Sequence, residues 1–406
     1  MGALSHIRVL DLSRILAGPW AGQILADLGA EVIKVERPGR GDDTRHWGPP
    51  WLCDERGEET GESAYYLCTN RGKRSVTIDI TQPEGQALVR RLAEKSDILL
   101  ENYKVGSLAK FGLDYASLRQ VNPRLIYCSI TGFGQTGPYR NRSGYDFLIQ
   151  GMGGLMSVTG ESDELPGGGP QKVGVALADI MTGLYAGNAC LAALAYRERT
   201  GSGQHVDLAL LDVQVATLAN QASNYLISGR APQRMGNSHP NIVPYQPFAS
   251  ADGHFILAVG NDQQFARLCE MLGQSELVQD ARFSSNAARV RNRTELVGLL
   301  TPLFQQKRSS DWMQLLERIA VPCGPINSID QVFQDPQVQA REMLIECDHP
   351  SAGRVPLVAS PIKLSESHLE PGLAPPLLGE HTDSVLGNLL GISDAERRVL
   401  RDKGVL

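Results

Sequence analysis

Asp179 is the residue of this chain whose type and setting most directly permit chemistry. It lies in the stretch GVALADIMTGLY, residues 174–185, after an apolar run at 173–177 and before a long pattern of small residues typical of a helix. We expect the apolar run to be a buried strand, so that Asp179 stands where a strand gives way to a helix. A carboxylate at that point can act as a nucleophile, because it is ionised at pH 7 and needs no base to activate it.

The same position also suits an ordinary helix cap. The first backbone N–H groups of a helix lack partners within the helix and favour negative charge. An aspartate side chain there commonly accepts hydrogen bonds from them, which would give Asp179 a structural role. In a catalytic site these N–H groups would instead be candidate donors to an oxyanion. The stretch itself is compatible with both interpretations.

Polar or basic residues follow several other expected strands. These segments are Arg37 after the strand at 31–36, Asn102 to Lys104 at the end of the strand at 97–103, and the glycine-rich loop 131–138 after the strand at 125–130. Ligands of open parallel sheets bind at the carboxyl ends of the strands, so we expect these loops to converge with Asp179 on one crevice. A carboxylate beside a basic crevice suits a large anionic ligand with one reactive group. Each loop alone is equally compatible with a solvated surface.

A compact basic cluster, Arg71, Lys73 and Arg74, precedes the strand expected at 75–80. Phosphates are bound by concentrated cations, and this cluster offers three within four residues. We therefore expect it to face the ligand, the alternative being that it forms a solvated charged face.

The elements that position these segments begin with a strand at 8–12, a helix at 21–28 and a strand at 31–36. Such a βαβ unit predicts a parallel sheet. A nicotinamide-dependent dehydrogenase would carry G-x-G-x-x-G after the first strand, whereas Gly18 and Gly22 give G-x-x-x-G. Close packing of the helix on the sheet is the alternative explanation for these glycines.

The rest of the chain predicts further elements and a domain boundary. Thr81 and Glu84 have the spacing of a capping box before a helix that runs to about residue 95. The other expected elements are a long loop at 47–63, a strand at 205–209, a helix at 213–227, a polar boundary at 229–245, and a strand at 255–259 followed by helices to about 321.

Composition limits the class of protein. The chain has 406 residues, a net charge of −6 and no long stripe of Lys and Arg, which argues against a nucleic-acid partner. Its seven cysteines are scattered without a C-x-x-C motif, so we expect neither a metal site nor a disulfide framework. The start resembles no signal peptide, and no apolar run approaches the ~18 residues of a membrane span. We expect two or three domains in a soluble, cytoplasmic protein without membrane contact.

Taken in order, motifs along essentially the whole chain resemble the class III coenzyme A transferases, the family of formyl-CoA transferase and carnitine-CoA transferase. The motifs are RVLDL at 8–12, AGP at 17–19, LGAEVIKVE at 28–36, NRGKRS at 70–75, ENY at 101–103, GYD at 144–146, AD at 178–179, TGSGQ at 200–204 and LLGEHT at 377–382. Within the family, VPYQPF at 243–248, GNDQQF at 260–265, DDTR at 42–45 and WGPP at 47–50 look most like the succinyl-CoA:glutarate CoA-transferase branch.

The resemblance implies an α/β fold. A large Rossmann-like domain with a parallel sheet, residues 1–228, would be joined to a smaller α+β domain, residues 229–330. Residues 331–406 would return to complete the large domain. Two such chains would form an interlocked homodimer, with the active site at the subunit and domain interface.

The resemblance also implies roles for individual residues. Asp179 would be the nucleophile. The carboxylates of a dicarboxylic substrate need a cation or N–H donors, and we expect Arg234, Ser238 and His239, in the polar stretch after the linker, to supply them, the alternative being that these residues belong to an ordinary polar surface loop. Coenzyme A, a substrate rather than a tightly bound cofactor, would contact Leu16, Ala17, Arg37, Arg74, Ile78, Asn102, Tyr103, Lys104, Lys110, Tyr145 and Asp146.

The implied reaction moves CoA from an acyl-CoA donor such as succinyl-CoA to a dicarboxylic acid such as glutarate. It would pass through an aspartyl anhydride and an aspartyl-CoA thioester, from which water must be excluded. The family's 2-methylacyl-CoA racemases carry Gly-His-Asp where this chain has Gly144-Tyr145-Asp146. Racemisation needs two acid/base groups, and the histidine that would supply one of them is missing here, which favours a transferase. Formyl-CoA transferases have a glutamine where Leu16 stands and a run of glycines where residues 235–239 contain one. A racemase, a transferase for another acid and a non-enzymatic acyl-CoA-binding protein are the alternatives.

Overall fold

The computed structural model describes residues 2–367, 369 and 372–406. The predicted large domain starts at residue 1, and its return segment contains residues 368, 370 and 371; these four lie outside the described residues. The chain divides into two compact units, each of them discontinuous in sequence. The first contains Met1–Leu155, Val173–Ser223 and Gln337–Leu406, and the second contains Met156–Lys172 and Asn224–Pro336.

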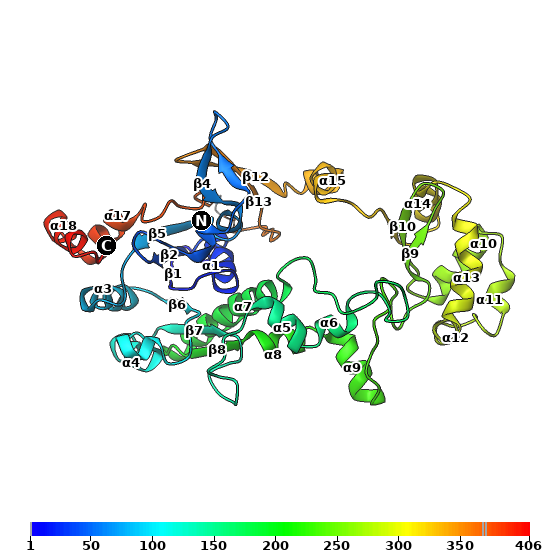
Figure 1. Ribbon diagram of the computed structural model, residues 1–406, viewed down its shortest axis with the longest axis horizontal. Coiled ribbons are helices and arrows are strands. Elements are labelled where there is room, and N and C mark those ends of the chain that lie inside the picture. The colour runs from blue at the N-terminus through cyan, green and yellow to red at the C-terminus, as the bar shows by residue number, and fades with distance from the viewer. Residues whose placement is uncertain (1, 368, 370–371) are drawn as a thin grey trace. The chain divides into compact units, whose positions relative to one another are not determined.

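The first unit is built on a six-stranded sheet whose strands are all parallel, in the order β5-β2-β1-β6-β7-β8. Its strands are β1 (Arg8–Asp11), β2 (Glu31–Glu36), β5 (Lys73–Thr77), β6 (Ile98–Glu101), β7 (Ile126–Thr131) and β8 (His205–Ala209). Nearly all residues of the central strands β2, β6 and β7 are buried, charged ones included, because both faces of the sheet are covered. The predicted parallel α/β sheet is confirmed (Figure 1).

Helices cover both faces of this sheet, and alternate residues of each strand point to opposite cores. Leu10, Ile33 and Leu99 pack with α3 (Pro83–Glu94), α4 (Tyr115–Val121) and α17 (Thr382–Leu390). Their neighbours Val9, Val32 and Leu100 pack with α1 (Ala17–Asp27), α5 (Asp146–Met152), α7 (Leu177–Thr200) and α8 (Leu210–Ala216). The period of two along the strands thus separates two apolar layers.

Small residues let α1 lie close to the sheet and to α7. A Cβ added to Gly18 would lie 2.3 Å from the Ser13 side chain, and one added to Gly22 would lie 2.8 Å from Asp11 Oδ2. A Cβ on Gly183 of α7 would lie 2.7 Å from the carbonyl oxygen of Ala17. The glycines of G-x-x-x-G therefore serve close packing.

Helix α7 also meets the length and composition of a membrane span, with a mean hydropathy of 1.3 over its 18-residue window. The expectation that nothing in the chain approaches such a span is wrong by this measure. The window is 44% buried, and α7 contacts α1, α5 and β7. Its apolar residues thus contribute to the core of the first unit.

Smaller elements surround the sheet. They are η1 (Asp43–His46), the hairpin of β3 (Trp51–Cys53) and β4 (Glu59–Ser63), α2 (Ala64–Leu67), η2 (Leu108–Phe111), α16 (Pro336–Ala340), the hairpin of β12 (Leu344–His349) and β13 (Gly353–Val358), and α18 (Asp394–Asp402). The hairpin β3–β4 occupies much of the segment expected to be a loop at 47–63.

The last part of the chain covers the outer side of the edge strand β5. The Gly72 N–H donates to the Leu373 carbonyl at 2.7 Å, and the His381 N–H donates to the Ser75 carbonyl at 2.9 Å. The Thr77 N–H donates to Thr382 Oγ1 at 3.0 Å. Backbone groups that an edge strand would leave open are therefore paired.

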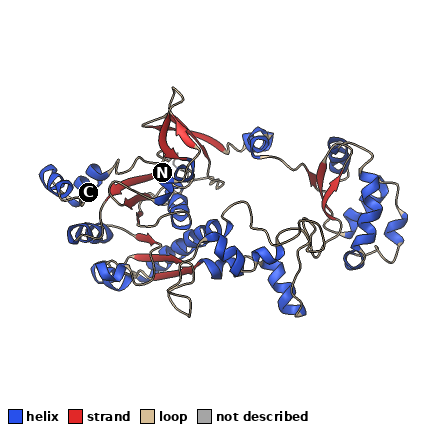
Figure 2. Cartoon of the chain, viewed as in Figure 1, coloured by secondary structure: helices blue, strands red, loops and turns tan. Residues whose placement is uncertain are grey.

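The second unit has its own apolar core. A three-stranded sheet of β9 (Tyr245–Ala249), β10 (His254–Ala258) and β11 (Cys323–Gly324) packs with helices (Figure 2). These helices are α10 (Asp262–Met271), α11 (Glu276–Gln279), α12 (Asn286–Arg291), α13 (Arg293–Phe304) and α14 (Ser309–Arg318). Phe248, Phe255 and Trp312 pack their rings around Phe304. Helix α15 (Ile329–Gln334) also belongs to this unit.

Several expected elements differ from the structure. Residues 173–176 form no strand, and Val175 is 56% exposed. The helix expected at 213–227 is broken at residues 217–218, so that α8 and α9 (Ala219–Ser228) are separate and Ala219 has a φ of 48°. Thr81 donates to Asp79 rather than capping α3, whose N-cap is Gln82.

Candidate functional site

Asp179 is the third residue of α7, and it does not cap that helix. Asp146, at the start of α5, does so in its place: its Oδ1 accepts the N–H of Ala178 at 2.8 Å and that of Asp179 at 3.3 Å. The Leu177 N–H donates to the Val175 carbonyl. Interpreting Asp179 as an N-cap is therefore wrong, and so is the expectation that the first N–H groups of α7 are open to an oxyanion.

The Asp179 carboxylate is buried without a hydrogen-bond donor among the residues that the structure describes. Only 9% of the residue is exposed. Burial, and next to it the negative charge of Asp146, raise the pKa of Asp179 to about 7. The expectation of full ionisation at pH 7 therefore does not hold, because a protonated form of Asp179 is present at that pH. A carboxylate left without donors is poorly stabilised as an anion, which favours attack on an electrophile.

A cavity of about 170 Å³ lies against Asp179 at the carboxyl edge of the sheet. The segments after β1, β6 and β7 form it, as parallel-sheet geometry requires. It brings Asp179 together with predicted site residues from distant parts of the chain: Leu16, Ala17, Asn102, Tyr103, Lys104 and Tyr145. Asp179 itself comes from the start of a helix, so the expectation that it lies at a further strand end is wrong.

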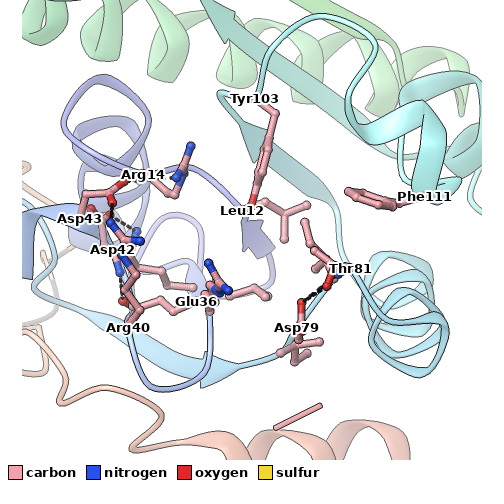
Figure 3. Close-up of a pocket in the computed structure, with 16 residues that line it drawn as sticks. Leu12, Arg14, Glu36, Arg40, Asp42, Asp43, Asp79, Thr81, Tyr103 and Phe111 are labelled. Carbon is pink, nitrogen blue, oxygen red and sulfur yellow. Dashed lines mark hydrogen bonds and ion pairs between the residues drawn. The ribbon is translucent and has the colours of Figure 1, made fainter. Parts of the chain in front are cut away.

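A second cavity, of about 380 Å³, adjoins the first along the same edge. Arg37 and Ile78 line it, and Tyr103 and Arg14 line both cavities. Figure 3 shows Tyr103 and Arg14 above this cavity, with Asp79 and Thr81 opposite them. The cavity against Asp179 is here called the inner cavity and the one lined by Arg37 the outer cavity. Because they share Arg14 and Tyr103, the two are together called the edge groove.

Three arginines in the edge groove were missed by sequence reasoning. Arg14 follows β1, and Arg140 and Arg142 follow β7 in the glycine-rich segment. The guanidinium carbon of Arg142 lies over the ring of Tyr139, 4.6 Å from its centre. The rule that selected Arg37, a cation at the carboxyl end of a parallel strand, could have found all three.

The basic cluster at 71–74 does not face the groove. Arg71 pairs with Asp27 at 2.6 Å, and Lys73, fully buried, pairs with Asp11 at 3.0 Å. Arg74 pairs at 2.9 Å with Glu31, the first residue of β2, at the opposite end of the strands. The expectation that this cluster binds ligand is therefore wrong for Arg71 and Lys73, and the structure does not bring Arg74 into the groove.

Other predicted site residues lie outside the two cavities. Lys110 is exposed on η2, next to Phe111, which lines the outer cavity. Asp146 caps α7 and does not line the groove.

The predicted carboxylate-binding residues belong to the second unit. Arg234 pairs with Asp163, Ser238 Oγ donates to Gln246 Oε1 at 3.2 Å, and the ring of His239 lies 5.1 Å from that of Tyr245. Their role as substrate ligands stays a prediction.

A parallel α/β sheet with an unpaired carboxylate beside a cation-lined groove is an arrangement that suits a large anionic ligand with one reactive group. The sequence pattern of CoA-transferase family III matches residues 4–382, and the chain belongs to this family. It is therefore an enzyme that transfers coenzyme A, and the resemblance seen in the sequence is confirmed.

Individual relatives are similar to this chain over nearly its whole length. The chain is 54% identical over 386 residues to the succinate–glutarate CoA-transferase of Agrobacterium fabrum, with 95% of each chain covered. It is 43% identical to the succinyl-CoA:glutarate CoA-transferase of Mus musculus, covering 100% of this chain and 91% of the relative. A crystal structure of a CAIB/BAIF family protein from Brucella suis superposes with a TM-score of 0.83 at 52% identity, covering 96% and 99% of the two chains.

Proposed function

We propose that this enzyme transfers CoA from succinyl-CoA to glutarate or a dicarboxylate of similar length, with Asp179 as the nucleophile. The names of the similar enzymes from Agrobacterium fabrum and Mus musculus support this substrate pair. The observation that carries the role of Asp179 is its carboxylate, which lies buried against the inner cavity without a donor among the described residues. A structural aspartate in such a place would be paired.

The edge groove is the proposed site of CoA. Arg37, Ile78 and Tyr103 would hold the adenosine and phosphate end in the outer cavity. Leu16, Ala17 and the segment Asn102 to Lys104 would guide the thiol end past Tyr145 to Asp179. Arg14, Arg140 and Arg142 add positive charge to this path, and Lys110 would meet phosphate from the exterior.

The chemistry follows from a carboxylate that attacks and is attacked in turn. An oxygen of Asp179 attacks the thioester carbonyl of succinyl-CoA, the C–S bond breaks, and CoA leaves as a thiolate. The product is an aspartyl–succinyl anhydride. The thiolate then attacks the aspartyl carbonyl and releases succinate, which leaves an aspartyl-CoA thioester.

The second half repeats these steps with the acceptor. A glutarate carboxylate attacks the aspartyl carbonyl and displaces the thiolate, which forms an aspartyl–glutaryl anhydride. Attack of the thiolate on the glutaryl carbonyl gives glutaryl-CoA and regenerates the Asp179 carboxylate. No proton is taken up or released overall, so no acid/base residue is needed beside Asp179.

Donors to the oxyanion would come from the start of α1. The N–H groups of Ala17 and Gly18 have no partner among the described residues, and Ala17 lines the inner cavity. The carbonyl of Ala17 lies beside Gly183, one turn after Asp179 on α7. These N–H groups therefore replace those of α7, which Asp146 occupies, as the proposed oxyanion donors.

We also propose the other features predicted from the sequence. Arg234, Ser238 and His239 would bind the distal carboxylate of the acid. The large domain would comprise residues 1–228, the small one 229–330 and the return segment 331–406, in an interlocked homodimer located in the cytoplasm.

Mass spectrometry of the intact enzyme after brief mixing with succinyl-CoA and hydroxylamine tests the proposal. A hydroxamate on Asp179 is expected, because hydroxylamine captures the anhydride or the thioester, and a panel of dicarboxylic acids should identify glutarate as an acceptor. The Asp179→Asn variant should bind CoA and form no hydroxamate. An unmodified Asp179 in an enzyme that still transfers CoA would contradict the proposed nucleophile.

A further inference from the structure

Ile15 has an unusual backbone conformation and lines the same cavity as the proposed nucleophile. Its φ is +73°, in the left-handed region that β-branched residues almost never adopt. It lies between β1 and α1, immediately before Leu16 and Ala17, and it lines the inner cavity with Asp179. A strained residue of this kind persists only where its surroundings hold it.

Asp42 supplies one hold on Ile15. The Ile15 N–H donates to both carboxylate oxygens of Asp42, at 3.2 and 3.3 Å. Asp42 is itself fixed: it accepts from Lys34 Nζ at 2.9 Å, and the side chains of both residues are fully buried. Lys34 Nζ also donates to the carbonyl of Ser13 at 2.9 Å. Lys34 therefore contacts the turn directly at Ser13 and, through Asp42, at Ile15.

Asn102 supplies a second hold from the end of β6. Its Oδ1 accepts the Arg14 N–H at 2.9 Å, and its Nδ2 donates to the Arg14 carbonyl at 2.6 Å. Both backbone groups of Arg14 are thus bound by one side chain. The turn before α1 is therefore bound by side chains from the segments that follow β2 and β6.

We infer that Asp42 is a positioning residue for the transfer reaction: by holding Ile15 in the left-handed conformation, it places the first residues of α1 against Asp179. This inference rests on the proposed function, because Leu16 and Ala17 must meet the reacting thioester for their position to matter. Asp42 also lines the outer cavity. One buried carboxylate therefore contributes to both ends of the edge groove.

The Asp42→Asn variant tests this role. It removes the charge that holds Lys34 and weakens the hold on the Ile15 N–H, while its size stays the same. We expect kcat to fall about tenfold to hundredfold, because a small displacement of reacting groups is costly, and KM for succinyl-CoA to change by a smaller factor, since Asp42 also lines the outer cavity. The matched control is Asp27→Asn, which alters a buried carboxylate paired with Arg71 at the far end of α1 and should leave kcat unchanged.

A rescue separates positioning from general stability. Glycine adopts positive φ without steric cost, so adding Ile15→Gly to Asp42→Asn should restore much of kcat. A loss caused by general destabilisation would not be rescued by a flexible residue. If Asp42→Asn does not fold, Asn102→Ala, which removes no buried charge, tests the same turn: kcat should fall and Ile15→Gly should again restore it.

The outcomes distinguish this inference from the proposed function. Unchanged kcat in both Asp42→Asn and Asn102→Ala, with no hydroxamate formed by Asp179→Asn, would overturn the positioning role and leave the nucleophile intact. A loss of kcat in Asp42→Asn that Ile15→Gly does not restore would also overturn it. Transfer that persists in Asp179→Asn would instead overturn the proposed function.

Discussion

Two buried aspartates near the start of α1, Asp11 and Asp179, have opposite surroundings. Asp11 accepts from Lys73 at 3.0 Å and from the Ser13 N–H at 2.9 Å, and it is completely buried. Burial alone would raise the pKa of Asp11, but Lys73 and Lys34 outweigh it and hold the pKa below its usual range. Asp179 has no such partner, and its pKa is raised to about 7.

The difference shows what makes a buried carboxylate structural or reactive. Around Asp11, cations and N–H donors converge, so that the charge is stabilised and the turn below α1 becomes rigid. At Asp179 the donors that would quench its charge are bound elsewhere, because Asp146 caps the helix. The paired Asp11 thus stabilises the base of α1, whose first residue lines the inner cavity together with the unpaired Asp179.

The largest effect expected from this comparison is on stability at Asp11. Asp11→Ala leaves Lys73 buried without its carboxylate, which should lower the free energy of unfolding by about 3–5 kcal/mol. Urea denaturation followed by circular dichroism measures the change. A decrease in the free energy of unfolding of less than about 1 kcal/mol would mean that the pair of Asp11 and Lys73 contributes as little as a surface ion pair.

Asp179→Asn should raise the free energy of unfolding, in contrast to Asp11→Ala. Because the pKa of Asp179 is higher in the folded chain (about 7) than its ordinary value of 3.8, the fold retains a proton that the unfolded chain releases between these values. The wild type therefore loses stability as pH rises through this window. We expect the variant to be more stable by roughly 2–4 kcal/mol at pH 8, with the gain vanishing near pH 4.

Denaturation of both proteins across this pH range measures the gain. A variant that is less stable than the wild type at pH 8 would show that Asp179 has a structural partner after all.

The same raised pKa predicts a pH dependence of the reaction. Attack requires the ionised carboxylate, so kcat/KM for succinyl-CoA should fall about tenfold per unit as pH drops below about 7. Asp146→Asn keeps an oxygen to cap α7 but removes the neighbouring charge, and should shift this limb to lower pH. A rate independent of pH between 5 and 7 would argue against a neutral fraction of Asp179.

The smallest effect is expected at Arg74. Its pair with Glu31 is partly exposed and distant from the groove, so Arg74→Ala should cost under about 1 kcal/mol of stability and leave KM for CoA unchanged. Arg37→Ala, which removes a cation lining the outer cavity, should raise KM for CoA in the same assay. If both substitutions raised KM for CoA equally, Arg74 would have to be counted among the residues that bind CoA.

Sequence reasoning predicted the parallel sheet because apolar runs and βαβ spacing are local signals. It placed β5 at 75–80 instead of Lys73–Thr77. The reason is that Lys73 is a buried charge whose partner, Asp11, is distant in sequence. The expected strand at 173–177 failed because apolar content alone does not show burial, and Val175 is exposed.

The site was predicted in outline for the same reason. Loops at the carboxyl ends of strands meet wherever a parallel sheet forms, so Asn102 and Arg37 could be selected without knowing their neighbours. The competition between Asp146 and Asp179 for the start of α7 could not be predicted, since the two are far apart in sequence and only the fold decides which one caps. The hydrogen bonds from the Ile15 N–H to Asp42 could not be predicted either, because they too join residues that only the fold brings together.

The covering of β5 by residues near 373–382 has a consequence during synthesis of the chain. This edge of the sheet can be completed only after most of the polypeptide has left the ribosome, including the whole second unit. Until then β5 presents open backbone groups, which invite pairing with other nascent chains. Premature termination before residue 373 should therefore yield aggregates rather than a smaller enzyme, and a chaperone that shields this edge would raise the yield.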